Sequence, residues 1–243
     1  MLLRSFKNLK IGKNNFISPK AIIHDNVTIG DNNNIYDDVI IYPNTLIGNN
    51  NNIFPRNIIG EFPVSSDDKY NKYDFNLTKG VEIGNNNLFH VSNIIFSGID
   101  NKTFIGNNNK FLAENHIAHD VKVFNNVTFY PRCIPGGYSI YLDYSNIGMS
   151  AIIHQKTVVG QYSMIGANST ITKNVFPFYI NINNKLHRLN EKKIPDDIKK
   201  YDHILQEINN NYITKNYDTS KYKLSEEIDN TLTEYIMRIM FIK

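Results

Sequence analysis

The string His116-Ile117-Ala118-His119-Asp120 brings two histidines and an aspartate together within five residues of this 243-residue sequence. The ordinary pKa of histidine lies near 6.5, so a neutral imidazole beside a carboxylate can accept a proton from a substrate as a general base. His119 is the candidate base because Asp120 follows it directly, and His116 lies three residues earlier. Surface histidines without a catalytic role are the alternative, and the string alone does not separate the two.

These side chains lie inside a repeat of six residues. Isoleucine occupies every sixth position from Ile11 to Ile59, and the register continues from Ile83 to Ile171 with one shift of four residues and with Phe, Val, Tyr or Pro at some positions. The position four residues after each of these holds a small or slim residue. In the N-terminal part the string Ile-Gly-x-Asn-Asn also recurs at intervals of 18 residues.

Six residues per face and 18 per turn predict a three-sided coil with one large apolar side chain per face pointing inward. Stacked coils would pair their backbone groups at about 4.8 Å, and about 24 six-residue units give about eight coils. Residues i and i+6 do not share a face of an α-helix, and an antiparallel sandwich needs turns about every 8–12 residues. The sequence therefore predicts an all-β solenoid, a parallel β-helix of hexapeptide repeats.

Asparagine makes up about one residue in six, which in other chains marks a low-complexity tract. Here the asparagines follow the repeat: many fall in the turn after Ile-Gly or at the slim inward position. Asparagine tolerates a left-handed backbone and can hydrogen-bond along a stack, so we interpret the bias as the turn chemistry of the coil.

The overall composition excludes several classes. A net charge of +3 from 26 basic and 23 acidic residues is nearly balanced and gives no sign of the strongly basic surface that binds nucleic acid. No apolar run approaches the roughly 20 residues of a membrane span, and the N-terminal residues are too short and basic for a secretory signal. With a single cysteine as well, we expect a cytoplasmic protein.

Two segments break the repeat, residues 61–80 and the short insertion at Ser97–Asp100. Loops on a rigid scaffold often carry function, although for the short insertion a tolerated surface loop explains the pattern equally well. After Phe176 the pattern becomes helical, with helix starts at Pro195 and Ser225. We expect a β-helix domain over residues 1–180 and a helical region over residues 181–243.

Other reactive groups are scarce. Cys133 occupies the slim inward column, so we expect a structural, unreactive thiol. Some six-residue-repeat solenoids bind zinc through a His-x4-His pair, which does not occur here, and we predict no metal site. Walker and Rossmann glycine motifs and the Gly-x-Ser-x-Gly nucleophile motif are also missing from the sequence.

The repeats, the loop at 61–80, the His116–Asp120 string, a later His-Gln pair and the helical tail together resemble the UDP-N-acetylglucosamine O-acyltransferases of lipid A biosynthesis. The similarity covers roughly residues 11 to 208. It implies a left-handed β-helix and a homotrimer with active sites between subunits. It also implies transfer of a (3-hydroxy)acyl group from the 4′-phosphopantetheine thioester of acyl carrier protein to UDP-GlcNAc, with no permanently bound cofactor.

The resemblance implies a role for each matching residue. His119 looks like the general base, Asp120 would orient it, and the Gly137 N–H would stabilise the oxyanion. The remaining matches would bind substrate: Asp67 and Lys69 in the long loop, His116 and Tyr138 beside the base, His154 and Gln155 at the nucleotide end, Ala167 where acyl-chain length is limited, and Asn190, Lys192 and Lys193 where the diphosphate is held.

Departures from the family pattern keep two other functions in view. Phe96 and Tyr138 stand where the family has histidines, the linker before the basic pair in the tail is shorter, and the last helices carry few basic residues. The second hypothesis is therefore N- or O-acylation or acetylation of a nucleotide-linked sugar from an acyl-CoA, for a surface glycan. The third is a non-catalytic solenoid that binds a sugar nucleotide.

Overall fold

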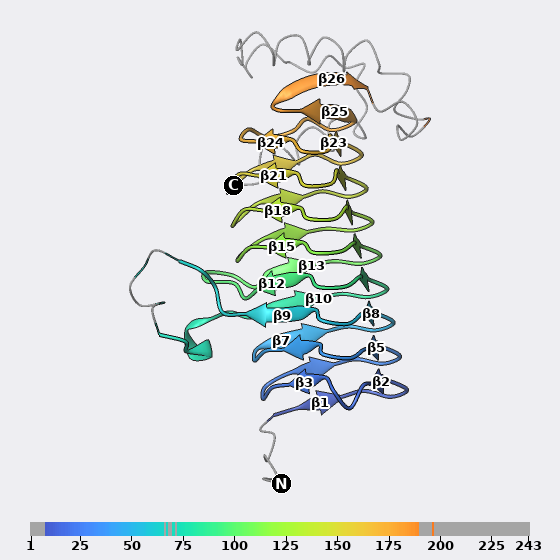
Figure 1. The fold of residues 1–243 in the computed structure, drawn as a ribbon, viewed down its shortest axis with the longest axis vertical. Helices are drawn as coiled ribbons and strands as arrows, with labels where there is room; N and C mark the ends of the chain where they lie inside the picture. The colour runs from blue at the N-terminus through green and yellow to red at the C-terminus, as the bar shows by residue number, and fades with distance from the viewer. Residues whose placement is uncertain (1–7, 66, 68–69, 71, 190–195, 197–243) are drawn as a thin grey trace, which may run out of the picture.

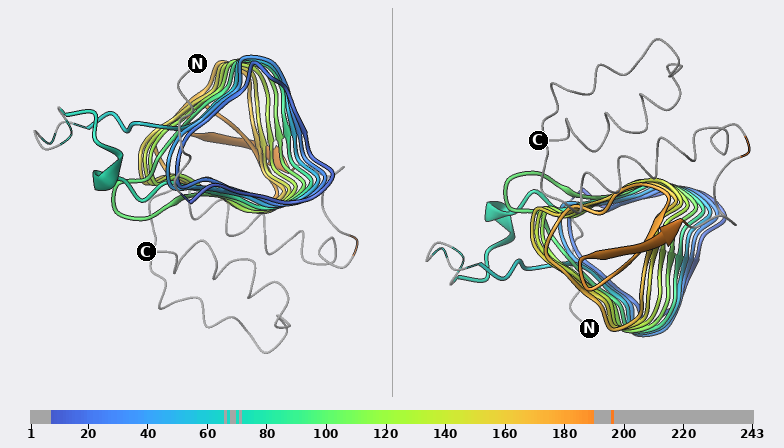
Figure 2. Two further views of the ribbon diagram at one scale, coloured as in Figure 1. Left: turned by 90° about the horizontal axis from the view of Figure 1, so that it is seen from below. Right: turned by 90° about the horizontal axis from the view of Figure 1, so that it is seen from above.

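The structure is a computed structural model that describes residues 8–65, 67, 70, 72–189 and 196. Its chain winds into a left-handed parallel β-helix whose cross-section is a triangle (Figures 1 and 2). Each face of the triangle is built of parallel strands, and most strands pair with the strand three places along the chain; the third face is divided into two sheets between β15 and β18. The predicted solenoid of about eight coils is therefore confirmed.

The strands are mostly two residues long because each face holds only one six-residue unit. The first face comprises β1 (Lys10–Ile11), β4 (Thr28–Ile29), β7 (Thr45–Ile47), β10 (Val81–Ile83), β13 (Thr103–Ile105), β16 (Lys122–Val123), β19 (Ile140–Tyr141) and β22 (Val158–Val159). The second comprises β2 (Phe16–Ile17), β5 (Asn34–Ile35), β8 (Asn52–Ile53), β11 (Leu88–Phe89), β14 (Lys110–Phe111), β17 (Thr128–Phe129), β20 (Asn146–Ile147), β23 (Met164–Ile165), β25 (Tyr179–Ile182) and β26 (Lys185–Leu189). The third comprises β3 (Ile22–Ile23), β6 (Ile40–Ile41), β9 (Ile58–Glu61), β12 (Ile94–Phe96), β15 (His116–Ile117), β18 (Ile134–Pro135), β21 (Ile152–Ile153) and β24 (Thr170–Ile171).

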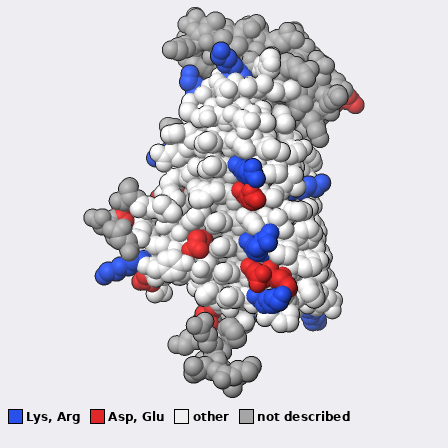
Figure 3. Space-filling view, in the orientation of Figure 1, with Lys and Arg blue, Asp and Glu red and all other residues white. Residues whose placement is uncertain are grey.

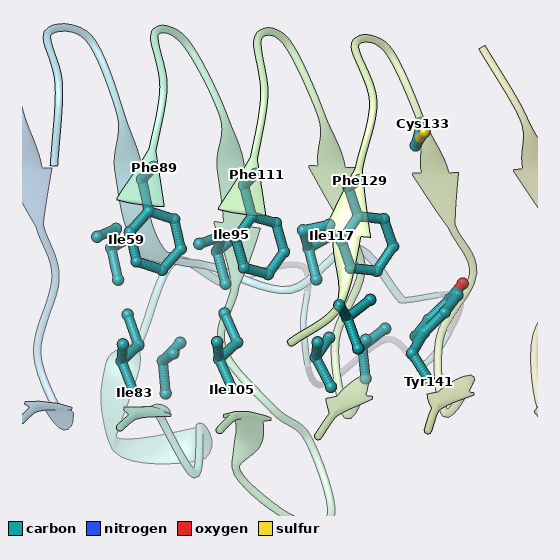
Figure 4. Packing of buried hydrophobic residues seen from close by; sticks show 14 of the residues in the cluster. Ile59, Ile83, Phe89, Ile95, Ile105, Phe111, Ile117, Phe129, Cys133 and Tyr141 are labelled. Atoms are coloured by element: carbon teal, nitrogen blue, oxygen red, sulfur yellow. The ribbon is translucent and has the colours of Figure 1, made fainter. Parts of the chain in front are cut away.

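The core is the column of large residues that the six-residue repeat predicts. Phe89, Phe111 and Phe129 are fully buried and stack with ring centroids 4.9 and 5.0 Å apart, and Tyr141 of the first face packs edge-on against Phe129 (Figure 4). Since each coil encloses only one such residue per face, its apolar interior is covered only by the coils above and below it. Stacking of coils is therefore what stabilises the fold.

Asparagine side chains form ladders that run along the coil axis. At the inward position, the Asn51 side chain donates to the Asn33 side chain at 3.0 Å, and Asn87 donates to Asn51 at 3.0 Å. The residue just before this position adopts a left-handed backbone, as at Asn50 with φ 58° and Asn86 with φ 59°. These pairs satisfy buried amides at the corners, and they confirm that the asparagines encode the turns.

Both breaks in the repeat leave the solenoid at the same corner (Figure 2). The loop at 61–80 carries a 3-10 turn, η2 (Phe75–Leu77), and its end at Gly80 forms an antiparallel bridge with Gly98 of the short insertion. The Gly98 N–H donates to the Gly80 carbonyl at 3.0 Å. The two insertions are thus one structural unit.

At the C-terminal end the solenoid closes with an antiparallel hairpin. β25 pairs in parallel with β23 of the last coil and antiparallel with β26. The helices predicted from Pro195 and Ser225 lie, apart from Asp196, outside the described residues. The division into domains at residue 180 stays a prediction.

Charged residues on the face shown in Figure 3 are scattered in small groups rather than gathered in one patch. Three of the ion pairs join neighbouring coils: Lys20 with Asp37, Lys102 with Glu82, and Arg132 with Glu114. All these side chains are substantially exposed, so each pair contributes little to stability.

Candidate active site

The predicted base lies at the corner that follows the third face, which we call the histidine corner. Its two turn positions are occupied in successive coils by His119 and Asp120, by Gly137 and Tyr138, and by Gln155 and Lys156. The Tyr138 N–H donates to the His119 carbonyl at 3.2 Å, and the Lys156 N–H donates to the Gly137 carbonyl at 2.9 Å. The 18-residue period therefore stacks these residues one above another.

His119 and Asp120 form a hydrogen-bonded pair. The distance from His119 Nδ1 to Asp120 Oδ2 is 3.0 Å, and the two side chains are 18% and 1% exposed. An ionised carboxylate only accepts hydrogen bonds, so Nδ1 carries the proton and Nε2 keeps its lone pair. This is the tautomer that a general base acting through Nε2 requires.

The short insertion wraps its backbone around Asp120. Asp120 Oδ2 accepts the N–H of Ile99 at 2.7 Å, and Oδ1 accepts the N–H groups of Asp100 at 3.0 Å and Asn101 at 2.6 Å. The Asp120 N–H in turn donates to Thr103 Oγ1 at 2.9 Å. Both carboxylate oxygens are thus fully engaged, which fixes the orientation of the group that holds the base.

These contacts also determine the charge of Asp120. Burial by itself raises the pKa of this carboxyl, but the hydrogen bonds from His119 and from the backbone of Ile99, Asn101 and Asp100 outweigh it and hold the pKa below its usual value. Asp120 is therefore a stable anion at neutral pH. A carboxylate with a lowered pKa orients a neighbouring histidine without taking its proton.

Gly137 packs directly against the imidazole of His119. A Cβ added to Gly137 would lie 2.9 Å from His119 Cε1 and 3.0 Å from Nε2, so only glycine leaves the ring in place. The Gly137 N–H has no hydrogen-bond acceptor among the described residues. A backbone donor without a partner beside the base is the arrangement that an oxyanion site needs.

His116 is the first residue of β15, three residues before His119, and its ring packs against Phe96 at a centroid distance of 4.6 Å. Burial lowers the pKa of His116, so this imidazole is neutral at physiological pH. Phe96, which stands where the family has a histidine, is buried and gives the site an apolar wall. His116 thus lines the site without adding charge.

The other predicted residues spread away from the base along the corner and the loop. His154 and Gln155 lie exposed in the coil after Gly137, with His154 Nδ1 3.0 Å from the Gln155 carbonyl oxygen. Ala167 is exposed at the corner between the second and third faces, and Asp67 is exposed in the long loop. Lys69, Asn190, Lys192 and Lys193 lie outside the described residues, and their roles stay predictions.

Sequence reasoning missed Asp100 and Thr103. The available signal was the break in the repeat at Ser97–Asp100, but its length alone does not reveal that the insertion folds back onto Asp120.

Cys133 is fully buried and its pKa is raised to about 12, mainly by burial, which confirms a structural thiol. Within residues 8–65, 67, 70, 72–189 and 196, His, Cys, Asp and Glu do not gather into a group of three able to hold a metal ion.

Comparison with known sequences finds relatives that share one name. An acyl-[acyl-carrier-protein]--UDP-N-acetylglucosamine O-acyltransferase of Nautilia profundicola is 37% identical over 113 residues, which is 44% of each chain. The enzyme of the same name from Sinorhizobium fredii is 36% identical over 76 residues, 31% of this chain and 28% of the relative. The matched segments thus span less than half of these relatives. No protein-family model matches the chain.

The solved structures extend the match over the whole fold. The UDP-N-acetylglucosamine acyltransferase of Bacteroides fragilis superposes with a TM-score of 0.77 and 28% identity over 98% of this chain and 96% of that one. The chain is a divergent relative of the UDP-N-acetylglucosamine O-acyltransferases. The corresponding enzyme of Francisella novicida gives a TM-score of 0.70 with 25% identity over 82% of this chain and 77% of its own. Among the residues that the structure of this protein describes, no helix is long and apolar enough to cross a bilayer.

Proposed function

We propose that this protein is an acyltransferase that moves a (3-hydroxy)acyl group from an acyl carrier protein thioester to a hydroxyl of a UDP-GlcNAc-type nucleotide sugar. The observation that carries the proposal is the histidine corner, where an oriented base faces a backbone N–H without a partner. The names of the relatives support the same reaction class. An acyl-CoA is the other donor that would present the same thioester.

The reaction follows from the positions of His119 and Gly137. His119 Nε2 removes the proton of the sugar hydroxyl, and the oxygen attacks the thioester carbonyl carbon. The carbonyl oxygen becomes an oxyanion that accepts a hydrogen bond from the Gly137 N–H, which stabilises the tetrahedral intermediate. The C–S bond then breaks, and the thiolate recovers the proton from the protonated His119.

Most of the remaining predicted residues would bind the substrates around this centre. In the proposal His116 and Tyr138 flank the base, and His154 and Gln155 hold the nucleotide. Asp67 and Lys69 contact the sugar, and Ala167 leaves space for the acyl chain, whereas Asn190, Lys192 and Lys193 hold the diphosphate. A cytoplasmic homotrimer with sites shared between subunits completes the proposal, which light scattering tests directly: a stable monomer would contradict the shared site.

A panel of donors and acceptors tests the reaction. Acyl carrier protein and CoA thioesters of several chain lengths are combined with UDP-GlcNAc, and the products are identified by mass spectrometry. We expect O-acylated UDP-GlcNAc from the carrier protein thioester, abolished in His119→Ala. Binding of the nucleotide sugar without turnover from any donor would instead favour the non-catalytic solenoid.

Phe96 and Tyr138 favour one second candidate, acylation or acetylation of an amino sugar from an acyl-CoA. The resemblance implies that both residues replace histidines of the family, and they pack against the two histidines of the site, Phe96 against His116 and Tyr138 against His119. The same panel with a nucleotide-linked amino sugar separates the two candidates. Faster turnover of the amine than of UDP-GlcNAc would select the second.

A further inference from the structure

Tyr138 makes three contacts that converge on the base from within its own chain. Its hydroxyl donates to Asp100 Oδ2 at 2.6 Å, and its ring meets the His119 ring edge-on at a centroid distance of 5.2 Å and an angle of 87°. The Lys156 ammonium lies 5.8 Å from the centre of the same ring. The Tyr138 side chain is thus held by the hydrogen bond to Asp100, by edge-on packing with the His119 ring and by the Lys156 ammonium near its ring.

Asp100 is itself held by the group that orients the base. Its N–H donates to Asp120 Oδ1, and Asp120 Oδ2 meets His119 Nδ1. His119, Asp120, Asp100 and Tyr138 therefore form a closed ring of contacts, which we call the clasp. A closed ring resists rotation of any one member, because moving the imidazole must break a hydrogen bond or displace a packed aromatic ring.

The phenol hydroxyl is already committed to a charged acceptor. A hydrogen bond from a neutral hydroxyl to a carboxylate is among the strong ones, and here it also raises the pKa of Tyr138, after burial as the main cause. Tyr138 has one proton to donate, and Asp100 accepts it. This argues against a role as a hydrogen-bond donor to the substrate.

From this geometry we infer that Tyr138 and Asp100 are positioning residues that hold the His119 ring with Nε2 toward the reacting hydroxyl. The short insertion at Ser97–Asp100 therefore belongs to the catalytic apparatus and is not a tolerated surface loop. The inference rests on the proposed function for its kinetic consequence, but the orientation of His119 is measurable without any substrate.

Two conservative variants remove the clasp without removing the ring or the loop. Tyr138→Phe deletes the hydroxyl, and Asp100→Asn deletes the charge that accepts it. We expect each to lower kcat by about ten- to hundredfold, because small misplacement of a reacting group has effects of that size, with the KM of both substrates nearly unchanged. A residue that binds substrate directly would instead raise KM.

The chain offers a control for each variant, a tyrosine at an equivalent turn position and an aspartate that also accepts a backbone N–H. Tyr144 has the same left-handed backbone, φ 61° against 60° for Tyr138, but lies at another corner and stacks on Tyr162. Asp31 accepts a backbone N–H in a ladder where other coils carry asparagine. Tyr144→Phe and Asp31→Asn should leave kcat and KM as in the unaltered protein.

Histidine labelled with ¹⁵N gives a readout that needs no turnover, with the His119 signal assigned through His119→Gln. In the unaltered protein we expect one signal with the proton on Nδ1. In Tyr138→Phe and Asp100→Asn it should broaden or split as the ring samples other orientations, while Tyr144→Phe leaves it sharp. An unchanged His119 signal in both clasp variants would overturn the inference even if no donor supports turnover, and unchanged kcat would overturn it in an active enzyme.

Discussion

Two corners of the same coil use the same backbone in opposite ways. At the asparagine corner, the turn position is occupied in successive coils by Asn107, Asn125 and Asp143. The Asn107 N–H donates to the Asn125 side chain at 2.9 Å, and the Asn125 N–H donates to the Asp143 side chain at 2.7 Å. At the histidine corner the same position holds His119, Gly137 and Gln155, and within the described residues the N–H groups of His119 and Gly137 find no such acceptor.

The difference between the two corners indicates that the asparagine corner stabilises the coil and that the histidine corner provides the candidate reactive groups. At the asparagine corner the side chain in each coil accepts a backbone N–H of the neighbouring coil. At the histidine corner Gly137 has no side chain, so it cannot accept the His119 N–H, and it leaves room for the His119 imidazole. Turn N–H groups without an acceptor occur at more than one corner of the described coil, and the Gly137 N–H is distinguished by belonging to a residue that packs against the His119 ring.

The sharpest test of this contrast is His119→Ala. Removing a general base typically lowers the rate by about 10²–10⁴-fold, while loss of one partly exposed side chain should leave the coil folded. Steady-state kcat with the carrier protein thioester, together with the thermal midpoint, measures both effects. Retention of most of the activity would remove His119 from the mechanism.

Gly137→Ala converts the histidine corner toward an ordinary one. The new methyl group would lie about 3.0 Å from His119 Nε2, so the imidazole must move while the backbone stays. We expect kcat to fall by about a hundredfold, with the thermal midpoint little changed. An active variant whose crystal structure shows an unmoved His119 ring would contradict the packing described above.

Asp120→Asn tests how the base is oriented and has a definite pH dependence. The lowered pKa of Asp120 means that its ionised form stabilises the fold above the ordinary pKa of aspartate, near 3.9, and that this contribution is lost as pH falls through the folded-state value. The variant should therefore melt at a lower temperature than the unaltered protein at pH 7. The gap should narrow below about pH 4.

A constant gap in melting temperature down to the lowest accessible pH would show that the charge of Asp120 is not what holds the insertion. Asp31→Asn, at the exposed asparagine ladder, serves as the control and should show a small gap at every pH.

Asn125→Ala should lower stability and leave activity unchanged, the opposite of the effects expected for His119→Ala. It removes the acceptor of the Asn107 N–H at 2.9 Å and of the Asn107 side chain at 3.1 Å. Leaving such groups without a partner costs about 1–3 kcal/mol, so denaturant unfolding should move to lower concentration while kcat stays near that of the unaltered protein. A large loss of activity with intact stability would show that the two corners are not separable.

Much of this molecule could be predicted from local periodicity. The isoleucine spacing predicts the three faces, the column that includes Phe89 and Phe111, and the slim positions that Asn33 and Asn51 occupy, because each contact joins residues one coil apart. The same rule stacks Gly137 above His119. A regular repeat converts sequence distance directly into spatial distance, so the main elements of the candidate site follow from it.

The clasp could not be predicted in this way. Asp100 lies in an insertion without a period, so its path depends on which backbone donors meet the Asp120 carboxylate and on the bridge between Gly80 and Gly98. Tyr138 likewise reads as a substituted histidine until its hydroxyl is seen bonded to Asp100.

The sequence by itself determined the coil and its register, since these depend on residues that repeat, and it singled out His119 as the candidate base because Asp120 follows it. Only the tertiary structure decided how the base is held and which N–H is left without a partner, since these depend on a folded loop closing on a buried charge.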